Sequence, residues 1–296
     1  MNKPTRIFPK INFKNTSSEE IENIIRSLRS KESCGYEEIS TKILKISAPF
    51  ISSPLTHIFN RAMFTGIFPA RMKYALVKPL FKKGEKKGCK LQTNLLTVVF
   101  LKVLEKLIYS RIMKHVVDNN ILTLEQYGFR PSSSTELALF NFINHILEEL
   151  QKKKNIVGGI FLDLQKAFDC ANHEILLNKL ISYGITGTTF KLIKTYLQNR
   201  YQRVVLNNNF FTSGSEWGKI INGVSQGSTL GPLLFLLYIN DLPSSTNNGN
   251  KIVLFADDTS IITSKPCILN FRNDINKVLH HIQKWFNTNL IFLNWE

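Results

Sequence analysis

The chain has 296 residues, of which 43% are hydrophobic and 11% aromatic, and 38 Lys and Arg stand against 22 Asp and Glu. These apolar side chains suffice for one large or two ordinary domains, which excludes a disordered basic tail. The formal net charge of +16 indicates a polyanionic partner. The four cysteines form no Cys-x-x-Cys pair, so neither a zinc site nor a disulfide framework is expected.

The sequence contains no segment typical of membrane insertion or export. Its longest apolar run, residues 230–239, has about half of the ~20 residues that a membrane-spanning helix needs, and it includes a glycine and a proline. The N-terminal MNKPTRIFPK lacks the apolar stretch of a secretory signal. We therefore predict no membrane partner and an intracellular, nuclear or cytoplasmic, non-secreted protein.

The positive charge is concentrated in the N-terminal half. Residues 71–90 hold eight Lys and Arg against one acid, whereas residues 156–296 hold twelve against nine. A basic cluster of this kind is typical of contact with a phosphate backbone. The alternative is a lysine-rich hairpin that is merely solvated.

The N-terminal half has alternating helix and strand signals. Ser18 and Glu20 open an apolar-periodic segment at 17–30, which predicts a helix. Two or three short helices are expected at 39–64, where Pro49 and Pro54 interrupt the pattern. A strand at 74–81 then leads into the turn Lys83-Gly84-Glu85 of a basic hairpin. Further helices are expected at 101–117 and at 137–153, the second from its apolar periodicity.

The C-terminal half contains more strands. We expect a buried strand at 155–164, helices at 174–183 and 188–198, a strand at 201–206, a glycine turn with an apolar helix at 223–242, a hairpin at 251–263 and a helix at 268–286. The stretch NLIFLN at 289–294 follows the last helix, and no internal repeat is present.

Three aspartates stand out because they lie at the ends of apolar strands. Asp163 is near the end of the strand at 155–164, and Asp257 and Asp258 occupy the turn of the hairpin at 251–263. If the strands are adjacent, the carboxylates share one pocket and repel each other unless a cation binds. Mg²⁺ prefers such oxygen ligands together with substrate phosphates. Two ions about 3.5–4 Å apart are typical of nucleotidyl transfer. A lone Asp-Asp pair would more simply be a turn or a helix cap.

The segments around these acids resemble a known family. FLDLQKAFD at 161–169, NGVSQGSTLGPLLFLLYINDL at 222–242 and FADDTSI at 255–261 resemble, in this order, the palm motifs of reverse transcriptases. The similarity is to non-LTR (LINE-like, jockey-type) retrotransposon enzymes. It extends upstream through ALVKPLFKKGEKK, KVLEKLIYSRI and YGFRPSSST and downstream to WFNTNLIFLN.

The resemblance implies an α+β right-hand polymerase fold with fingers and palm and without a thumb. It implies a helical extension of the fingers at 1–70, fingers at 71–155 and a palm at 156–296 that is truncated before the thumb. The implied activity is that of an RNA-directed DNA polymerase, which transfers a nucleotide from a dNTP to a primer 3′-hydroxyl with two Mg²⁺ ions, Mn²⁺ being an alternative. Its partners would be an RNA template, a DNA primer and dNTPs. An intron-type maturase matches these motifs less well.

The family likeness also assigns residue roles. The catalytic and metal-binding residues would be Asp163, Asp257 and Asp258. The nucleotide-binding residues would be Phe168, whose ring excludes a 2′-hydroxyl, with Gln226, Gly227 and Lys82. The nucleic-acid-binding residues would be Lys83, Gly128, Arg130, Arg200 and Arg203. The structural alternatives are a core role for Phe168, a turn at Gly128 and solvated lysines.

The sequence departs from the family at one contact and at its ends. Residues 89–99, CKLQTNLLTVV, lack the arginine that grips the incoming triphosphate in the family. A hydrogen bond to a charged group contributes about 1.5–3 kcal/mol, so nucleotide binding would be weaker. We expect the thumb and the endonuclease domain to be absent from this chain. The alternative function is therefore a truncated, catalytically impaired remnant that only binds nucleic acid.

Overall fold

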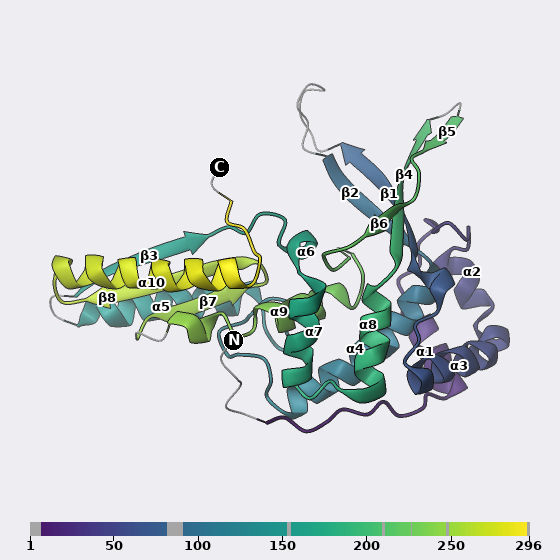
Figure 1. The fold of residues 1–296 in the computed structure, drawn as a ribbon, viewed down its shortest axis with the longest axis horizontal. Helices are drawn as coiled ribbons and strands as arrows, with labels where there is room; N and C mark the ends of the chain where they lie inside the picture. Colours follow the sequence, from purple (N-terminus) through teal and green to yellow (C-terminus); the bar gives the residue numbers. More distant parts are fainter. Residues whose placement is uncertain are drawn as a thin grey trace. The chain divides into compact units, whose positions relative to one another are not determined.

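The computed structural model describes residues 7–81, 91–152, 155–208, 211–225, 227–246 and 249–294. The chain divides into two compact units (Figure 1). The first unit comprises Met1–Asn119, Leu180–Ile221 and Ser225–Gly231, and the second comprises Asn120–Lys179, Asn222–Val224 and Pro232–Glu296. Both contain helices and strands, which confirms the α+β class. The division into residues 1–70, 71–155 and 156–296 stays a prediction, because these units group residues by contact and not by role.

The first unit combines a twisted sheet with several helices. Its elements are α1 (Ser18–Ser27), α2 (Thr41–Ile46), α3 (Ala48–Thr65), η1 (Ala70–Lys73), β1 (Tyr74–Phe81), β2 (Leu91–Thr97), α4 (Val99–Asp118), α8 (Gly187–Leu197), β4 (Arg200–Asn208), β5 (Phe211–Gly214) and β6 (Gly218–Ile220). The strand order is β2-β1-β4-β5, and β6 also pairs with β4. β1 is antiparallel to β2, which confirms the two arms of the predicted hairpin, and parallel to β4.

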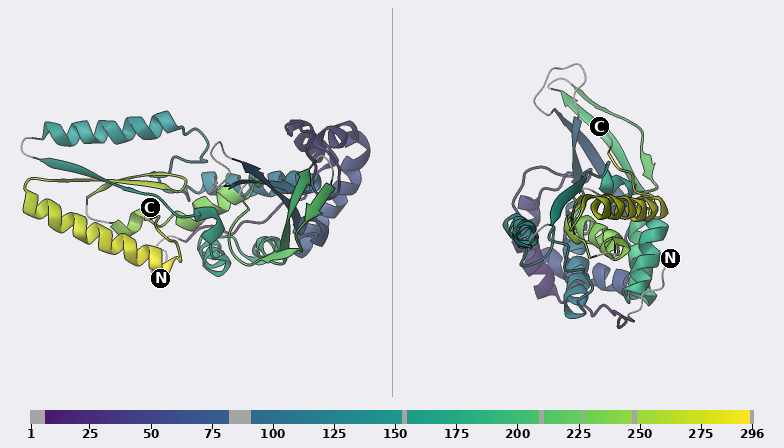
Figure 2. Two further views of the ribbon diagram at one scale, coloured as in Figure 1. Left: turned by 90° about the horizontal axis from the view of Figure 1, so that it is seen from above. Right: turned by 90° about the vertical axis from the view of Figure 1, so that its left-hand side faces the viewer.

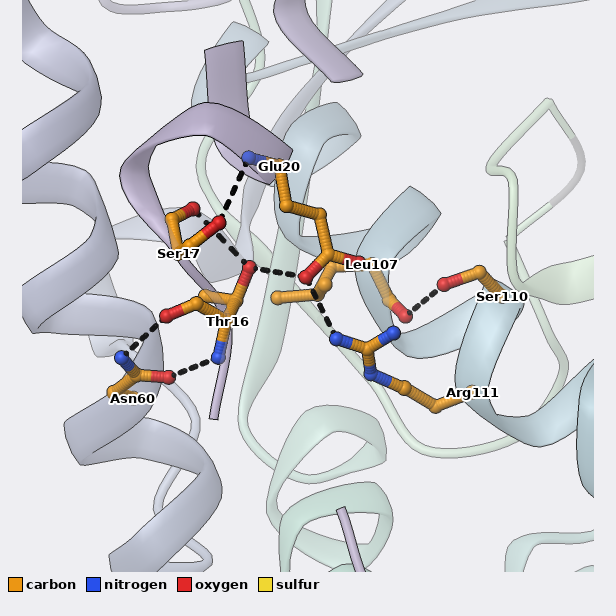
Figure 3. Close-up of polar contacts among 7 residues, drawn as sticks. All are labelled: Thr16, Ser17, Glu20, Asn60, Leu107, Ser110 and Arg111. Atoms are coloured by element: carbon orange, nitrogen blue, oxygen red, sulfur yellow. Dashed lines mark hydrogen bonds and ion pairs between the residues drawn. The ribbon is translucent and has the colours of Figure 1, made fainter. Parts of the chain in front are cut away.

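The start of α1 shows why a helix forms there. The Ser17 hydroxyl caps the helix by accepting a hydrogen bond from the Glu20 backbone N–H at 3.2 Å. The Glu20 carboxylate in turn accepts hydrogen bonds from Thr16 Oγ1 and Arg111 Nη2, each at 2.7 Å, and the Asn60 side chain bonds to the Thr16 backbone (Figure 3). These contacts fix α1 against α3 and α4.

One predicted helix break is wrong. Pro49 lies in the first turn of α3, where a missing N–H is harmless, but Pro54 lies inside the helix, which continues to Thr65. Pro54 removes one backbone hydrogen bond near the N-terminal end of the helix. The helix continues because its inner face remains packed, with Phe59 fully buried and Leu55 7% exposed.

The core of the first unit is built around α4. Its side chains Leu101, Leu104, Leu107 and Ile108 are fully buried, and burying each such side chain contributes about 1.5–3 kcal/mol. One residue on this buried stretch, Glu105, is charged and also fully buried.

The second unit is built on an antiparallel sheet in the order β3-β8-β7. Its elements are α5 (Thr135–Gln151), β3 (Ile156–Leu162), α6 (Ala167–Cys170), η2 (Pro243–Thr246), β7 (Lys251–Phe255), β8 (Asp258–Lys265) and α10 (Ile268–Thr288). Helices α7 (His173–Ser182) and α9 (Gly231–Ile239) run from one unit into the other along the chain. The sheet lies between α5 and α10, which cover opposite faces (Figure 2).

Two helices of the second unit bury different shares of their apolar residues. The side chains of residues 233–238 on α9 are at most 1% exposed, so this segment is part of the core. In contrast, the predicted apolar stripe of α5 is largely exposed, with Phe140 at 66% and Leu150 at 56%. The periodicity therefore predicted the α5 helix but not the burial of its face. No helix within the described ranges is long and apolar enough to span a membrane.

Candidate active site

Asp257 and Asp258 lie where β7 turns tightly into β8. Phe255 and Asp258 pair across the hairpin, which leaves only Ala256 and Asp257 in the turn. Ala256 has a φ of 55°, a left-handed conformation that is unfavourable for a residue with a Cβ atom, and it is 4% exposed. The surrounding residues must therefore hold this turn in place.

The segment 125–128 supplies that support. The buried Gln126 carboxamide oxygen accepts hydrogen bonds from the backbone N–H groups of Ala256 at 3.0 Å and Gly128 at 2.8 Å. The backbones of Glu125 and Tyr127 bond to Leu254 on β7, each at 2.8 Å. A Cβ atom on Gly128 would lie 2.3 Å from the Ala256 nitrogen, so only glycine fits. Gly128, predicted to contact template, thus packs behind the turn that carries Asp257.

Asp163 directly follows β3, whose last residue pairs with Thr259 on β8. This register brings Asp163 to the same end of the sheet as Asp258. The Asn294 side chain donates a hydrogen bond to Asp163 Oδ2 at 2.8 Å, and its backbone N–H bonds to the Asp163 carbonyl at 2.9 Å. The stretch that follows α10 therefore fixes the orientation of this carboxylate. Asn294 lies in the stretch NLIFLN at 289–294 and was not among the predicted site residues.

The three aspartates form a negatively charged site. The pKa of Asp258 is raised above its ordinary value by partial desolvation, by the charge of Asp257 and by the charge of Asp163. Asp163 and Asp258 are exposed and Asp257 is half-buried. Partial desolvation of Asp258 and the repulsion among the three charges therefore both favour a cation here.

These residues can supply part of a metal coordination shell. Among the residues that the structure describes, no three His, Cys, Asp or Glu side chains are arranged to hold a metal ion by themselves. Mg²⁺ usually takes one or two carboxylates and completes its shell with waters and substrate phosphates. The clustered carboxylates, with a raised pKa at Asp258, fit a hard divalent cation that binds together with a phosphate substrate.

Phe168 lies on α6 close to the aspartates in sequence and within the same unit. Its ring is half-buried and stacks on Phe235 of α9, with the ring centroids 4.5 Å apart. The ring of Phe129 meets it edge-on at 6.3 Å. Phe168 therefore has a firm packing partner and retains an accessible part, so the structure is compatible with both of its predicted roles.

The glycine turn before α9 contacts the α6 segment. The backbone N–H groups of Gly223 and Val224 donate hydrogen bonds to the carbonyls of Ala171 and Phe168, both at 2.8 Å. Gly223 has a φ of 87°, and a Cβ atom there would lie 2.7 Å from the Asp169 carbonyl oxygen. Close approach of the chain's own backbone at Asp169 therefore explains this glycine.

The other residues predicted to bind nucleotide or nucleic acid lie in different surroundings. Arg130 is half-buried, and its Nη1 donates a hydrogen bond to the Thr123 carbonyl at 2.8 Å. In the first unit, Gly227 has a φ of 93°, and a Cβ atom there would meet no described residue within 4 Å. Arg203 on β4 lies over the Trp217 ring at 4.9 Å. Lys82, Lys83 and Gln226 lie outside the described residues.

Arg200 differs most from its predicted role. It is 3% exposed, and its guanidinium lies 4.7 Å from the centre of the Tyr196 ring. Contact with a phosphate backbone requires a surface cation, so this burial argues against the predicted contact.

The second unit thus presents a carboxylate site at the end of a sheet, suited to divalent cations and phosphate chemistry. Comparison with known proteins gives the family: the chain belongs to the reverse transcriptase (RNA-dependent DNA polymerase) family, whose model matches residues 82–296. The chain is 29% identical to the RNA-directed DNA polymerase from the mobile element jockey of Drosophila funebris over 276 aligned residues. The alignment covers 90% of this chain and 29% of the relative.

Two further relatives from Drosophila melanogaster agree with this assignment. The RNA-directed DNA polymerase from mobile element jockey is 28% identical, covering 90% of this chain and 29% of the relative. The probable RNA-directed DNA polymerase from transposon BS is 27% identical, covering 90% of this chain and 30% of the relative. The chain spans about three tenths of the length of these relatives.

Proposed function

We propose that the chain is an RNA-directed DNA polymerase that copies an RNA template by adding dNTPs to the 3′-end of a DNA primer. The observation that carries this proposal is the joint placement of Asp163, Asp257 and Asp258. Partial desolvation and the charges of Asp257 and Asp163 raise the pKa of Asp258. Membership of the reverse transcriptase family supports the reaction type. The protein would act inside the cell, where nucleic acids and dNTPs are available.

The same proposal includes the arrangement of the chain. We expect it to form the fingers and palm of a right-hand polymerase, with the first unit contributing the basic hairpin and the second unit contributing the aspartates. The formal net charge of +16 supports nucleic acid binding along the phosphate backbone.

In this mechanism the residues of the second unit hold and orient the reactants. Asp163 and Asp257 would hold two Mg²⁺ ions, with Asp258 as the third carboxylate of the site. When bound, such ions lower the pKa of a primer 3′-hydroxyl and neutralise charge on the triphosphate. Asn294 keeps the Asp163 carboxylate oriented through its 2.8 Å hydrogen bond. The Phe168 ring, held by its stack on Phe235, would exclude a ribose 2′-hydroxyl.

Primer extension tests the proposal directly. The wild-type chain, an RNA template with an annealed DNA primer, dNTPs and Mg²⁺ should yield extended primer, and the Asp257→Asn/Asp258→Asn double variant should yield none. Asp118→Asn is the matched control, since Asp118 is an exposed acid at the end of α4 and its variant should extend at the wild-type rate. Wild-type extension no greater than that of the double variant would refute the proposal.

The alternative function is binding of nucleic acid without synthesis. The missing arginine in residues 89–99 favours it, because the triphosphate would lose a charged contact. This alternative predicts salt-dependent RNA or DNA binding with no extension. Charge reversal at Lys82 and Lys83 that left the affinity unchanged would exclude the basic hairpin as the binding surface.

A further inference from the structure

A buried carboxylate lies in the first unit, far along the chain from the aspartates. Glu105 is fully buried on α4, and its neighbours Leu104 and Ile108 are fully buried as well. Burial raises the pKa of its carboxyl group, whereas Arg200 and two hydrogen bonds lower it. A carboxylate in an apolar core is costly unless its oxygens are satisfied and a cation is near.

Both oxygens of Glu105 have a partner. Oε1 accepts a hydrogen bond from the Tyr196 hydroxyl on α8 at 2.7 Å, and Oε2 accepts one from the Thr229 backbone N–H at 2.9 Å. Arg200 supplies the nearby positive charge, with its guanidinium stacked on the Tyr196 ring. The Nε and Nη1 atoms of Arg200 are buried and have no hydrogen-bond partner within the described ranges, so its attraction to Glu105 is through charge.

The Thr229 N–H belongs to a short segment, residues 227–231, that is tight on one side and open on the other. Ser228 Oγ accepts a hydrogen bond from the Gly231 N–H at 2.9 Å and donates one to the Ser225 carbonyl at 2.8 Å. A Cβ atom on Gly231 would lie 2.6 Å from the Ser225 carbonyl oxygen, whereas one on Gly227 would have no neighbour within 4 Å in the described part of the chain.

We propose that Glu105 is a positioning residue that sets the backbone of residues 227–231 for the incoming nucleotide, with Tyr196 and Arg200 holding its carboxylate. This inference rests on the proposed function, because it takes the open side of Gly227 as a surface that a nucleotide approaches. Glu105 itself is buried and does not touch the nucleotide. Its effect is transmitted through the Thr229 N–H.

A merely structural role for Glu105 makes a different prediction. If the residue only filled the core, its replacement would weaken the whole unit and would affect residues 227–231 no more than other segments. A positioning role predicts a local effect on this segment that exceeds the effect on α2 and α3. The two roles are therefore distinguished by which backbone segments become more flexible when Glu105 is replaced.

The first measurement is hydrogen exchange followed by mass spectrometry on the full chain. Glu105→Gln keeps a neutral acceptor and should speed exchange of the 227–231 amides about fivefold, and Glu105→Leu, which removes the acceptor, should speed it more. Leu104→Ala is the matched control, since it removes packing from the same buried stretch. It should not speed amide exchange in residues 227–231 more than in α2 and α3. Exchange in Glu105→Gln within twofold of wild type, or accelerated equally across α2 and α3, would overturn the proposal.

The second measurement is steady-state primer extension. Glu105→Gln should raise the KM for dNTP about fivefold with kcat changed by less than about threefold, whereas Leu104→Ala should leave the KM unchanged. If Glu105→Gln speeds amide exchange in residues 227–231 but leaves the KM for dNTP unchanged, the proposal that Glu105 positions this segment for the nucleotide is overturned. If the wild-type chain extends no primer, the proposed function fails, and the exchange experiment alone decides whether Glu105 holds the segment.

Discussion

Replacing Asp258 by asparagine should make the protein more stable while it removes activity. Asp258 faces the charges of Asp257 and Asp163. Since exposed charge pairs are worth about 0.2–1 kcal/mol each, removing two repulsive pairs should raise the free energy of unfolding by roughly 0.4–2 kcal/mol in the absence of divalent cations. The gain is modest because the Asp258 side chain is exposed.

The pH dependence of this effect has a definite sign. The pKa of Asp258 is raised in the folded state, so the folded protein binds this proton more tightly than the unfolded chain does. The advantage of Asp258→Asn should therefore be full at pH values above the raised pKa. It should disappear as the pH falls through the raised pKa toward the ordinary carboxyl range.

Divalent cations should reverse the order of stability of the wild type and Asp258→Asn. Urea unfolding would be measured in EDTA and in Mg²⁺, with Asp118→Asn as the control for loss of an acid remote in sequence. A free Mg²⁺ concentration ten times Kd stabilises a protein by about 1.4 kcal/mol, and this gain should be smaller in Asp258→Asn than in wild type. The reasoning is refuted if the variant is less stable than wild type in EDTA, or if Mg²⁺ stabilises both equally.

Three further changes test the surroundings of the site, and Gly214→Ala is the control for the first of them. Gly128→Ala places a Cβ atom 2.3 Å from the Ala256 nitrogen and should lower the free energy of unfolding in urea by about 1–3 kcal/mol. Gly214→Ala, whose Cβ would lie at an ordinary 3.5 Å, should cost less than about 0.5 kcal/mol. Phe168→Val should increase incorporation of rNTPs relative to dNTPs by about tenfold in single-nucleotide extension. Asn294→Ala should lower kcat/KM about tenfold by releasing the aspartate after β3, and an unchanged value would show that this hydrogen bond is dispensable.

Local sequence signals predicted most of the elements of the fold. Strands such as β3 and β7 are continuous apolar runs, and helices such as α1 and α10 show apolar periodicity. The same signals predicted the positions of Asp163 and Asp257, because both lie at strand ends, where side chains of adjacent strands meet. What they missed were short or context-dependent pieces, namely α6, β5 and β6, which depend on neighbours distant in the sequence.

The supporting residues of the site could not be predicted from local pattern. Gln126 and Asn294 act through hydrogen bonds to segments 130 and 131 residues away, and nothing in their immediate sequence specifies these partners. Arg200 looked like a surface cation because charge alone carries no information on burial. Its burial follows from the stack on Tyr196 and from the carboxylate of Glu105.

The two carboxylate sites illustrate opposite uses of an acidic side chain. Asp163 and Asp258 are exposed at the end of a sheet, so their charges remain available to a cation and their repulsion costs little in its absence. Glu105 is fully buried, so its charge is available only to the groups packed against it. An exposed acid can exchange ligands in each reaction cycle, whereas a buried one can hold a backbone segment in one conformation. Exposure therefore separates the residues expected to bind reactants from the residue proposed to position them.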